Sequence, residues 1–338
     1  MKRYGRIDRE AKADIVATVI RYAGYGLSQR SVCVMAGISI SFFHVTRQRL
    51  GTEVEPTGKD PRKGFNANAI LPEEEKAVVE YAIANPNYFH RELTWRIIDA
   101  EITYISATTT YRILKKYGLI GPNIQRKSYG WIHKYSNEAR APDERWQTDL
   151  TYLQYGGRDV YQLSFIDVYS RYIVFSITLL NMESRTVSDA FDKYIRDHKH
   201  ELKRIPVVQS DNGSPYIGHE FKAVMREFEI EHAFCHPATP TENVIIERWH
   251  RTFKENLSEH GEPEDFEGFV FAIQETIAYY NHERYHQSLG YVTPFEFYRG
   301  DPKKIFNERK NYCKIVRTKR RLKHATERIK ILSIKGTI

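Results

Sequence analysis

The feature that most constrains the fold is a change in hydrophobic periodicity near residue 145. Before this point apolar residues recur every three or four positions, as in amphipathic helices, and after it they alternate, as in strands. We expect strands over Trp146–Tyr155, Asp159–Val168 and Arg171–Leu180, with a hairpin turn at Gly156–Gly157 between the first two. The chain therefore combines an α-helical front part with a sheet in its centre.

Helices and short strands alternate after the third strand. The pattern predicts in order a helix over Thr186–His198, a strand over Ile205–Ser210, a helix over Glu220–Phe228, a strand over Ile230–Phe234 and a long helix from about Thr241. Three antiparallel strands followed by such alternation predict a mixed five-stranded α/β sheet with helices on both faces. This order resembles the ribonuclease H-like arrangement.

The front part contains two groups of three predicted helices. The first group spans residues 9–50 and the second begins at Pro72 and ends before Gly118. In each group a turn joins two short helices, as in a helix-turn-helix whose second helix enters the major groove of DNA. A generic small helical bundle is the alternative for the first group. The expected DNA-binding side chains are Ser41, His44 and Arg47 in the first group and Thr108, Thr109, Arg112, Lys115 and Lys116 in the second.

Charge is distributed unevenly along the chain. The net charge is +8, yet residues 143–300 hold 26 acidic against 16 basic residues, and residues 301–338 hold 13 basic against 3 acidic. A basic front and a basic tail therefore flank an acidic centre, which predicts that the flanks bind nucleic acid. In the tail we expect Arg320 and Arg321 to contact phosphates, with a solvated run of charges as the alternative.

These patterns predict six segments. They are a helix-turn-helix domain (1–50), a linker (51–70), a second helix-turn-helix domain (71–120), a basic connector (121–142), the catalytic core (143–300) and a basic C-terminal tail (301–338). The sequence lacks a run of about 18 apolar residues and an apolar leader, so we expect a soluble cytoplasmic protein with no membrane partner. The three cysteines, Cys33, Cys235 and Cys313, lie far apart and are expected to be buried apolar residues.

Three acids fall at positions where the predicted sheet would bring them together. Asp149 lies in the middle of the first strand, where a carboxylate is costly to desolvate without a cationic partner. Asp211 follows directly on the fourth strand, and Glu247 lies on the long helix. On that helix Ile245, Ile246, Trp249, Phe253 and Leu257 form an apolar stripe, and Asn243, Glu247, Arg251 and Lys254 form a polar one.

Clustered carboxylates repel one another unless divalent cations bind between them. Oxygen ligands alone favour Mg²⁺ or Mn²⁺ over zinc, and two such ions can stabilise the attacking and leaving oxygens of a phosphoryl transfer. We therefore expect Asp149, Asp211 and Glu247 to be the catalytic residues and to hold two Mg²⁺ or Mn²⁺ ions. Asn243, Arg251 and Lys254 would contact the DNA.

Five segments carry a resemblance to a known family. They are Trp146–Asp149, Ser210–Gly213, His236–Asn243, Glu247–Lys254 and Tyr280–Pro294. Together they resemble the integrase core of bacterial insertion-sequence transposases, which belong to the DDE superfamily that includes retroviral integrases. Asp211 and Glu247 are separated by 35 residues, the spacing for which that family is named. Ala238 stands where the family usually has glycine, and no His/His/Cys/Cys pattern precedes the core, which favours the insertion-sequence branch.

The resemblance implies a bacterial DNA transposase. Such an enzyme recognises the terminal inverted repeats of its element, cleaves the 3′ ends with water and joins each 3′-hydroxyl to target DNA. Double-stranded DNA would be the partner, and holding two ends together would require a homodimer or a higher oligomer. The main alternative is a DNA-binding regulator that kept the fold and lost catalysis. A nuclease acting on RNA–DNA hybrids is disfavoured because it would not need two helix-turn-helix modules.

Overall fold

A computed structural model describes residues 9–24, 28–50, 66–120, 139–236 and 242–334. The chain divides into two compact units. One unit consists of residues 1–121 together with 308–338, and the other consists of residues 122–307. Most helices and strands before residue 258 lie close to the ranges that the sequence predicts, whereas the helix at Phe266–His282 was not predicted. Each unit is described separately below.

A five-stranded mixed sheet forms the centre of the second unit. Its strands are β1 (Arg145–Tyr155), β2 (Arg158–Asp167), β3 (Ile173–Leu179), β4 (Val207–Ser210) and β5 (Glu231–Phe234). The strand order is β3-β2-β1-β4-β5, in which β1, β2 and β3 pair antiparallel and β4 pairs parallel with β1 and with β5. The expected mixed sheet of five strands is confirmed, and β1 is its central strand.

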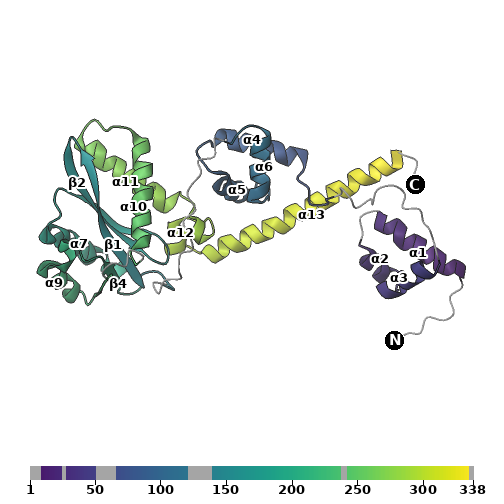
Figure 1. Ribbon diagram of the computed structural model, residues 1–338, viewed down its shortest axis with the longest axis horizontal. Helices are drawn as coiled ribbons and strands as arrows, with labels where there is room; N and C mark the ends of the chain where they lie inside the picture. The colour runs from purple at the N-terminus through teal and green to yellow at the C-terminus, as the bar shows by residue number, and fades with distance from the viewer. Residues whose placement is uncertain (1–8, 25–27, 51–65, 121–138, 237–241, 335–338) are drawn as a thin grey trace. The chain divides into compact units, whose positions relative to one another are not determined.

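Helices cover both faces of this sheet (Figure 1). The helices on one face are α7 (Ser184–His198), α8 (Ser214–Ile217) and α9 (His219–Glu227), and their core includes Phe165, Phe191 and Phe221. The opposite face is covered by α10 (Val244–Leu257) and α11 (Phe266–His282) through a core that includes Ile246, Trp249 and Phe253. Because successive residues of a strand point to opposite faces, β1 contributes Trp146 to the first core and Leu153 to the second.

The first three helices of the chain form a small group with its own core. They are α1 (Arg9–Gly24), α2 (Gln29–Met35) and α3 (Ile40–Arg49), and Ser28 and Ser39 cap α2 and α3 by accepting backbone N–H hydrogen bonds. Val19, Val32 and Phe43 are buried between them. The helices lie where the sequence predicts them, because the capping serines and the apolar spacing define their ends locally.

A second group consists of α4 (Pro72–Ala84), α5 (His90–Asp99) and α6 (Ala107–Lys116). Its core contains Val78, Leu93, Ile97 and Ile113, and Ser106 caps α6. At the start of α4 the Glu74 carboxylate accepts a hydrogen bond of 2.8 Å from the Leu71 backbone N–H.

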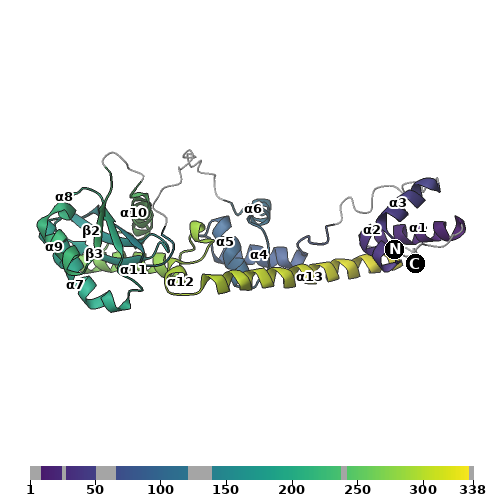
Figure 2. The same cartoon turned by 90° about the horizontal axis from the view of Figure 1, so that it is seen from below.

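The C-terminal segment differs from the prediction. Residues expected to be a separate basic tail form instead one long helix, α13 (Pro302–Ile334), which packs along the group of α4, α5 and α6 (Figure 2). Its buried face consists of Arg309, Cys313, Val316 and Arg320, spaced by four, three and four residues. Two of these four residues are arginines, so hydrophobic periodicity does not reveal the face.

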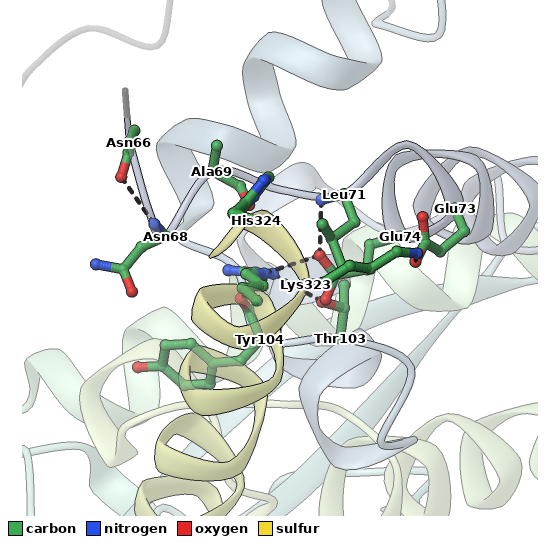
Figure 3. A network of polar contacts seen from close by, with 11 residues as sticks. Asn66, Asn68, Ala69, Leu71, Glu73, Glu74, Thr103, Tyr104, Lys323 and His324 are labelled. Atoms are coloured by element: carbon green, nitrogen blue, oxygen red, sulfur yellow. Dashed lines mark hydrogen bonds and ion pairs between the residues drawn. The ribbon is translucent and has the colours of Figure 1, made fainter. Parts of the chain in front are cut away.

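Ion pairs fasten α13 to the α4–α6 group. Arg309 makes two hydrogen bonds of 2.7 Å with Asp99, and Arg320 donates to Glu74 and to Thr103, each at 2.8 Å. Glu74 and Thr103 are themselves hydrogen bonded, and Lys323 pairs with Glu73 at the rim (Figure 3). Helix α13 is therefore an integral part of this helical group.

Candidate active site

The central strand β1 carries Asp149 on the face covered by α10. Its Oδ1 atom accepts a hydrogen bond of 2.8 Å from the Leu150 backbone N–H, and its Oδ2 atom lies 3.4 Å from Nδ1 of His250 on α10. The Asp149 side chain is 25% exposed and that of His250 is 10% exposed. The first predicted acid is thus partly shielded from water and held at both of its oxygens.

The neighbouring strand β4 places Asp211 next to Asp149. In the parallel pairing Gln209 lies opposite Gln147. Asp211 and Asp149 each come two residues after these paired glutamines, so the two aspartates lie at corresponding positions. Asp211 Oδ1 accepts a hydrogen bond of 2.9 Å from the Gly213 backbone N–H. Partial removal from water and the negative charge of Asp149 raise the pKa of the Asp211 carboxyl, while the Gly213 hydrogen bond opposes this rise.

Glu247 lies in the first turn of α10. Burial of Ile246, Trp249 and Phe253 against the sheet orients this helix and leaves Glu247 on its accessible side. Partial burial and then the charge of Asp149 raise the pKa of the Glu247 carboxyl, against an opposite effect of His250 and Arg251. The carboxylate of Asp149 is therefore the one that interacts with both other acids.

The donor chemistry of this cluster suits a hard divalent cation, because all three donors are carboxylates. Across the ranges that the structure describes, no three His, Cys, Asp or Glu side chains are close enough together to hold one metal ion. Asp149 instead interacts pairwise with Asp211 and with Glu247. Pairwise ligation fits Mg²⁺, which usually keeps several waters and takes one or two protein carboxylates together with substrate phosphates.

Most of the side chains that we expected to bind DNA are at the surface. Ser41, His44 and Arg47 are exposed on α3, Thr108, Arg112, Lys115 and Lys116 are exposed on α6, and Arg251 and Lys254 are exposed on α10. Thr109 is half-buried and its hydroxyl lies 2.9 Å from that of Ser106. Lys116 also forms an ion pair of 2.6 Å with Glu75.

Two of the expected DNA contacts are corrected by the structure. Arg320 is 5% exposed and bound to Glu74 and Thr103, so it stabilises the helical group instead of facing a ligand. Asn243 is 7% exposed at the start of α10 and does not belong to the exposed polar stripe. Arg321 is exposed and donates a hydrogen bond of 3.3 Å to Asn68. Ala238 lies outside the described residues.

Two further side chains at the site were missed by sequence reasoning. Gln147 is fully buried, donates to the Glu242 carbonyl at 2.6 Å and accepts from the Ile246 N–H at 3.3 Å. His250 contacts Asp149 as described above. A signal for Gln147 was present, because a polar residue two positions before Asp149 on the same strand face needs a buried partner. No comparable signal marked His250, one turn after Glu247.

The sheet order and the carboxylates on β1, after β4 and on α10 define a ribonuclease H-like fold with an acidic site. Family models described as "Integrase core domain" match residues 139–240 and residues 228–294. Residues 139–294 are thus similar to an integrase core domain, and the resemblance expected from the sequence is confirmed.

Individual proteins similar to this chain include transposases of bacterial insertion sequences. The putative transposase InsK for insertion sequence element IS150 of Escherichia coli K12 is 26% identical over 184 residues, covering 53% of this chain and 60% of that protein. The transposase for insertion sequence element IS904 of Lactococcus lactis is 28% identical over 164 residues, covering 47% of this chain and 63% of that protein. The similarity thus spans less than two thirds of either relative.

Among solved structures, the integrase catalytic core domain of HTLV-2, in complex with magnesium, is 17% identical. The structural match covers 48% of this chain and 100% of the viral chain, with a TM-score of 0.40. All three cysteines are buried and unpaired, as expected, and no helix within the described ranges is long and apolar enough to cross a membrane.

Proposed function

We propose that this chain is a DNA transposase that cleaves the 3′ ends of its element and joins them to target DNA. The observation that carries the proposal is the placement of Asp149 on the central strand β1, of Asp211 directly after the neighbouring strand β4, and of Glu247 in the first turn of α10. After partial burial, the charge of Asp149 contributes to the raised pKa of each of the other two carboxyls, so Asp149 lies close enough to interact with both Asp211 and Glu247. A structural role does not explain such repulsion, which is unfavourable unless cations bind there.

The three carboxylates would hold two Mg²⁺ or Mn²⁺ ions, Asp149 with each of its two neighbours. When bound, such ions stabilise the attacking and leaving oxygens of an in-line phosphoryl transfer. The chain itself would orient the DNA backbone through Arg251 and Lys254, which are exposed on the same helix as Glu247. Arg251 also offsets part of the negative charge of Glu247.

DNA binding is assigned to the helical groups. On α3 and α6 the exposed polar residues face away from the buried cores, as expected of helices that enter a groove. On α13 the exposed lysines Lys310 and Lys314 lie one turn apart. We assign to these lysines and to Arg321 the phosphate contacts that were expected of the basic tail. Inverted-repeat recognition and assembly of at least two copies on DNA complete the proposal.

The test is strand transfer by purified Asp149→Asn with oligonucleotides that carry the element end. We expect Mg²⁺-dependent cleavage and joining by the wild type, none by the variant, and equal end binding by both. Full joining by Asp149→Asn would refute the assignment of the site. End binding without cleavage by the wild type would instead support the alternative, a DNA-binding regulator without catalysis. The presence of all three carboxylates argues against that alternative.

A further inference from the structure

The start of helix α10 has an unusual support from the sheet. Asn243, which precedes the helix, makes no side-chain capping hydrogen bond. The Gln147 carboxamide of β1 takes that place: its Oε1 accepts from the Ile246 N–H, one of the first helical N–H groups, which lack partners within a helix. Its Nε2 donates to the Glu242 carbonyl at 2.6 Å, so one side chain of β1 holds both sides of the helix start.

A second contact between the same two elements lies one turn further along α10. His250 is 7% exposed, and its Nδ1 atom faces Asp149 Oδ2 at 3.4 Å. Within the described residues its Nε2 atom is buried and has no hydrogen-bond partner. Leaving a buried polar atom unpaired costs about 1–3 kcal/mol. An apolar side chain of similar size would avoid this cost, so packing alone does not explain a histidine here.

The two contacts lie on either side of Glu247. Ile246 precedes Glu247 by one residue and His250 follows it by three, while Gln147 and Asp149 lie two residues apart on one face of β1. With helix contacts fixed at both points, α10 can neither slide along β1 nor rotate about its axis without breaking one of them. The positions of Glu247 and Asp149 relative to each other depend on both contacts.

We propose that Gln147 and His250 are positioning residues that fasten α10 to β1 and thereby set the spacing of the Asp149 and Glu247 carboxylates for cation binding. The inference rests on the proposed function and adds two residues that do not bind the metal or the DNA themselves. Groups that orient metal ligands typically change metal affinity or activity by 10- to 100-fold when they are removed. We expect an effect of this size from the loss of either contact.

The test uses the full-length protein and Mn²⁺ as the probe. Gln147→Met keeps the length of the side chain and removes both hydrogen bonds, and His250→Leu keeps much of the volume and removes the contact with Asp149. His250→Asn is the conservative variant, because its amide nitrogen can donate from near the position of Nδ1. Glu255→Gln, a neutralised exposed residue on the same helix, is the matched control. Mn²⁺ binding is measured without DNA by electron paramagnetic resonance, below each variant's unfolding midpoint.

We expect the Mn²⁺ dissociation constant to rise 10- to 100-fold in Gln147→Met and His250→Leu, and to stay within threefold of wild type in His250→Asn and Glu255→Gln. Saturating Mn²⁺ should restore part of the strand-transfer activity that Gln147→Met and His250→Leu lose, as expected if these variants position the ions poorly. Unchanged affinity in both of the first two variants overturns the proposal. So does a His250→Asn variant that binds no better than His250→Leu, because a merely structural histidine would give that result.

The outcome is separable from the proposed function. Wild-type protein that binds no Mn²⁺ in an Asp149-dependent manner would refute the metal site itself, whatever Gln147→Met and His250→Leu do. Wild-type protein that binds Mn²⁺ and joins DNA, with positioning variants that do the same at equal affinity, would refute only the inference about Gln147 and His250.

Discussion

The buried ion pair between Arg320 and Glu74 allows a quantitative prediction about α13. The Arg320 and Glu74 side chains are 6% and 10% exposed, and the guanidinium also donates to Thr103 and to the Tyr104 carbonyl. Arg320→Ala would leave the Glu74 carboxylate buried without its countercharge. Loss of one partner of a buried pair typically costs about 3–5 kcal/mol.

The expected magnitude lies at the lower end of this range. Glu74 would keep the hydrogen bonds that it accepts from the Leu71 N–H at 2.8 Å and from Thr103 Oγ1 at 2.9 Å. We therefore expect Arg320→Ala to weaken the attachment of α13 by about 3 kcal/mol. Because 1.4 kcal/mol corresponds to a factor of ten, the open state of this helix should become roughly 100-fold more populated.

Hydrogen exchange measured by mass spectrometry on the whole protein checks this prediction. Amides of α13 and of the start of α4 should exchange roughly 100-fold faster in Arg320→Ala, whereas amides of the central sheet should not change. Lys323→Ala is the matched control, because its ion pair with Glu73 is exposed and such pairs contribute little. Equal protection of α13 in wild type and Arg320→Ala would show that the buried pair does not hold the helix, and would refute the reasoning.

Two other predictions concern the charges of the site and of α13. A carboxyl whose pKa is raised in the folded state contributes stability that is present below about pH 4 and is lost as the pH rises through its folded pKa. In metal-free protein at pH 7, Asp211→Asn and Glu247→Gln should therefore each raise the melting temperature, and the gain should disappear on acidification; a lower melting temperature at pH 7 would contradict the repulsion. Lys310→Gln combined with Lys314→Gln should reduce the slope of log affinity for DNA against log salt by about 2, since each phosphate contact contributes roughly 0.9. Glu308→Gln is the control, and an unchanged slope in the double variant would show that these lysines are only solvated.

The sequence predicted the parts of the fold whose signals are local. Alternating apolar residues marked β1, β2 and β3, and apolar spacing marked the buried face of α10. Asp149, Asp211 and Glu247 could be selected because each occupies a defined place relative to one of these elements. The central strand and its parallel neighbour lie side by side in a sheet of this order, and their register brings Asp149 and Asp211 together.

Only the tertiary structure decided where the isolated charges and amides are used. Arg309 and Arg320 belong to a basic segment of the sequence, where we expect surface positions because a charged side chain is rarely buried without a partner. Both are buried in the structure, and their partners Asp99 and Glu74 lie more than 200 residues away in the sequence. Gln147 and His250 are similar cases, because Gln147 bonds to Glu242 and Ile246 and His250 contacts Asp149, and all of these partners lie about 100 residues away. Hydrophobic periodicity shows which face of a helix or strand is apolar, whereas the partner of a buried polar group is fixed by packing between distant segments. For this reason the sequence alone determined the helices, the strands and the candidate acids. Only the tertiary structure decided which polar contacts join these elements.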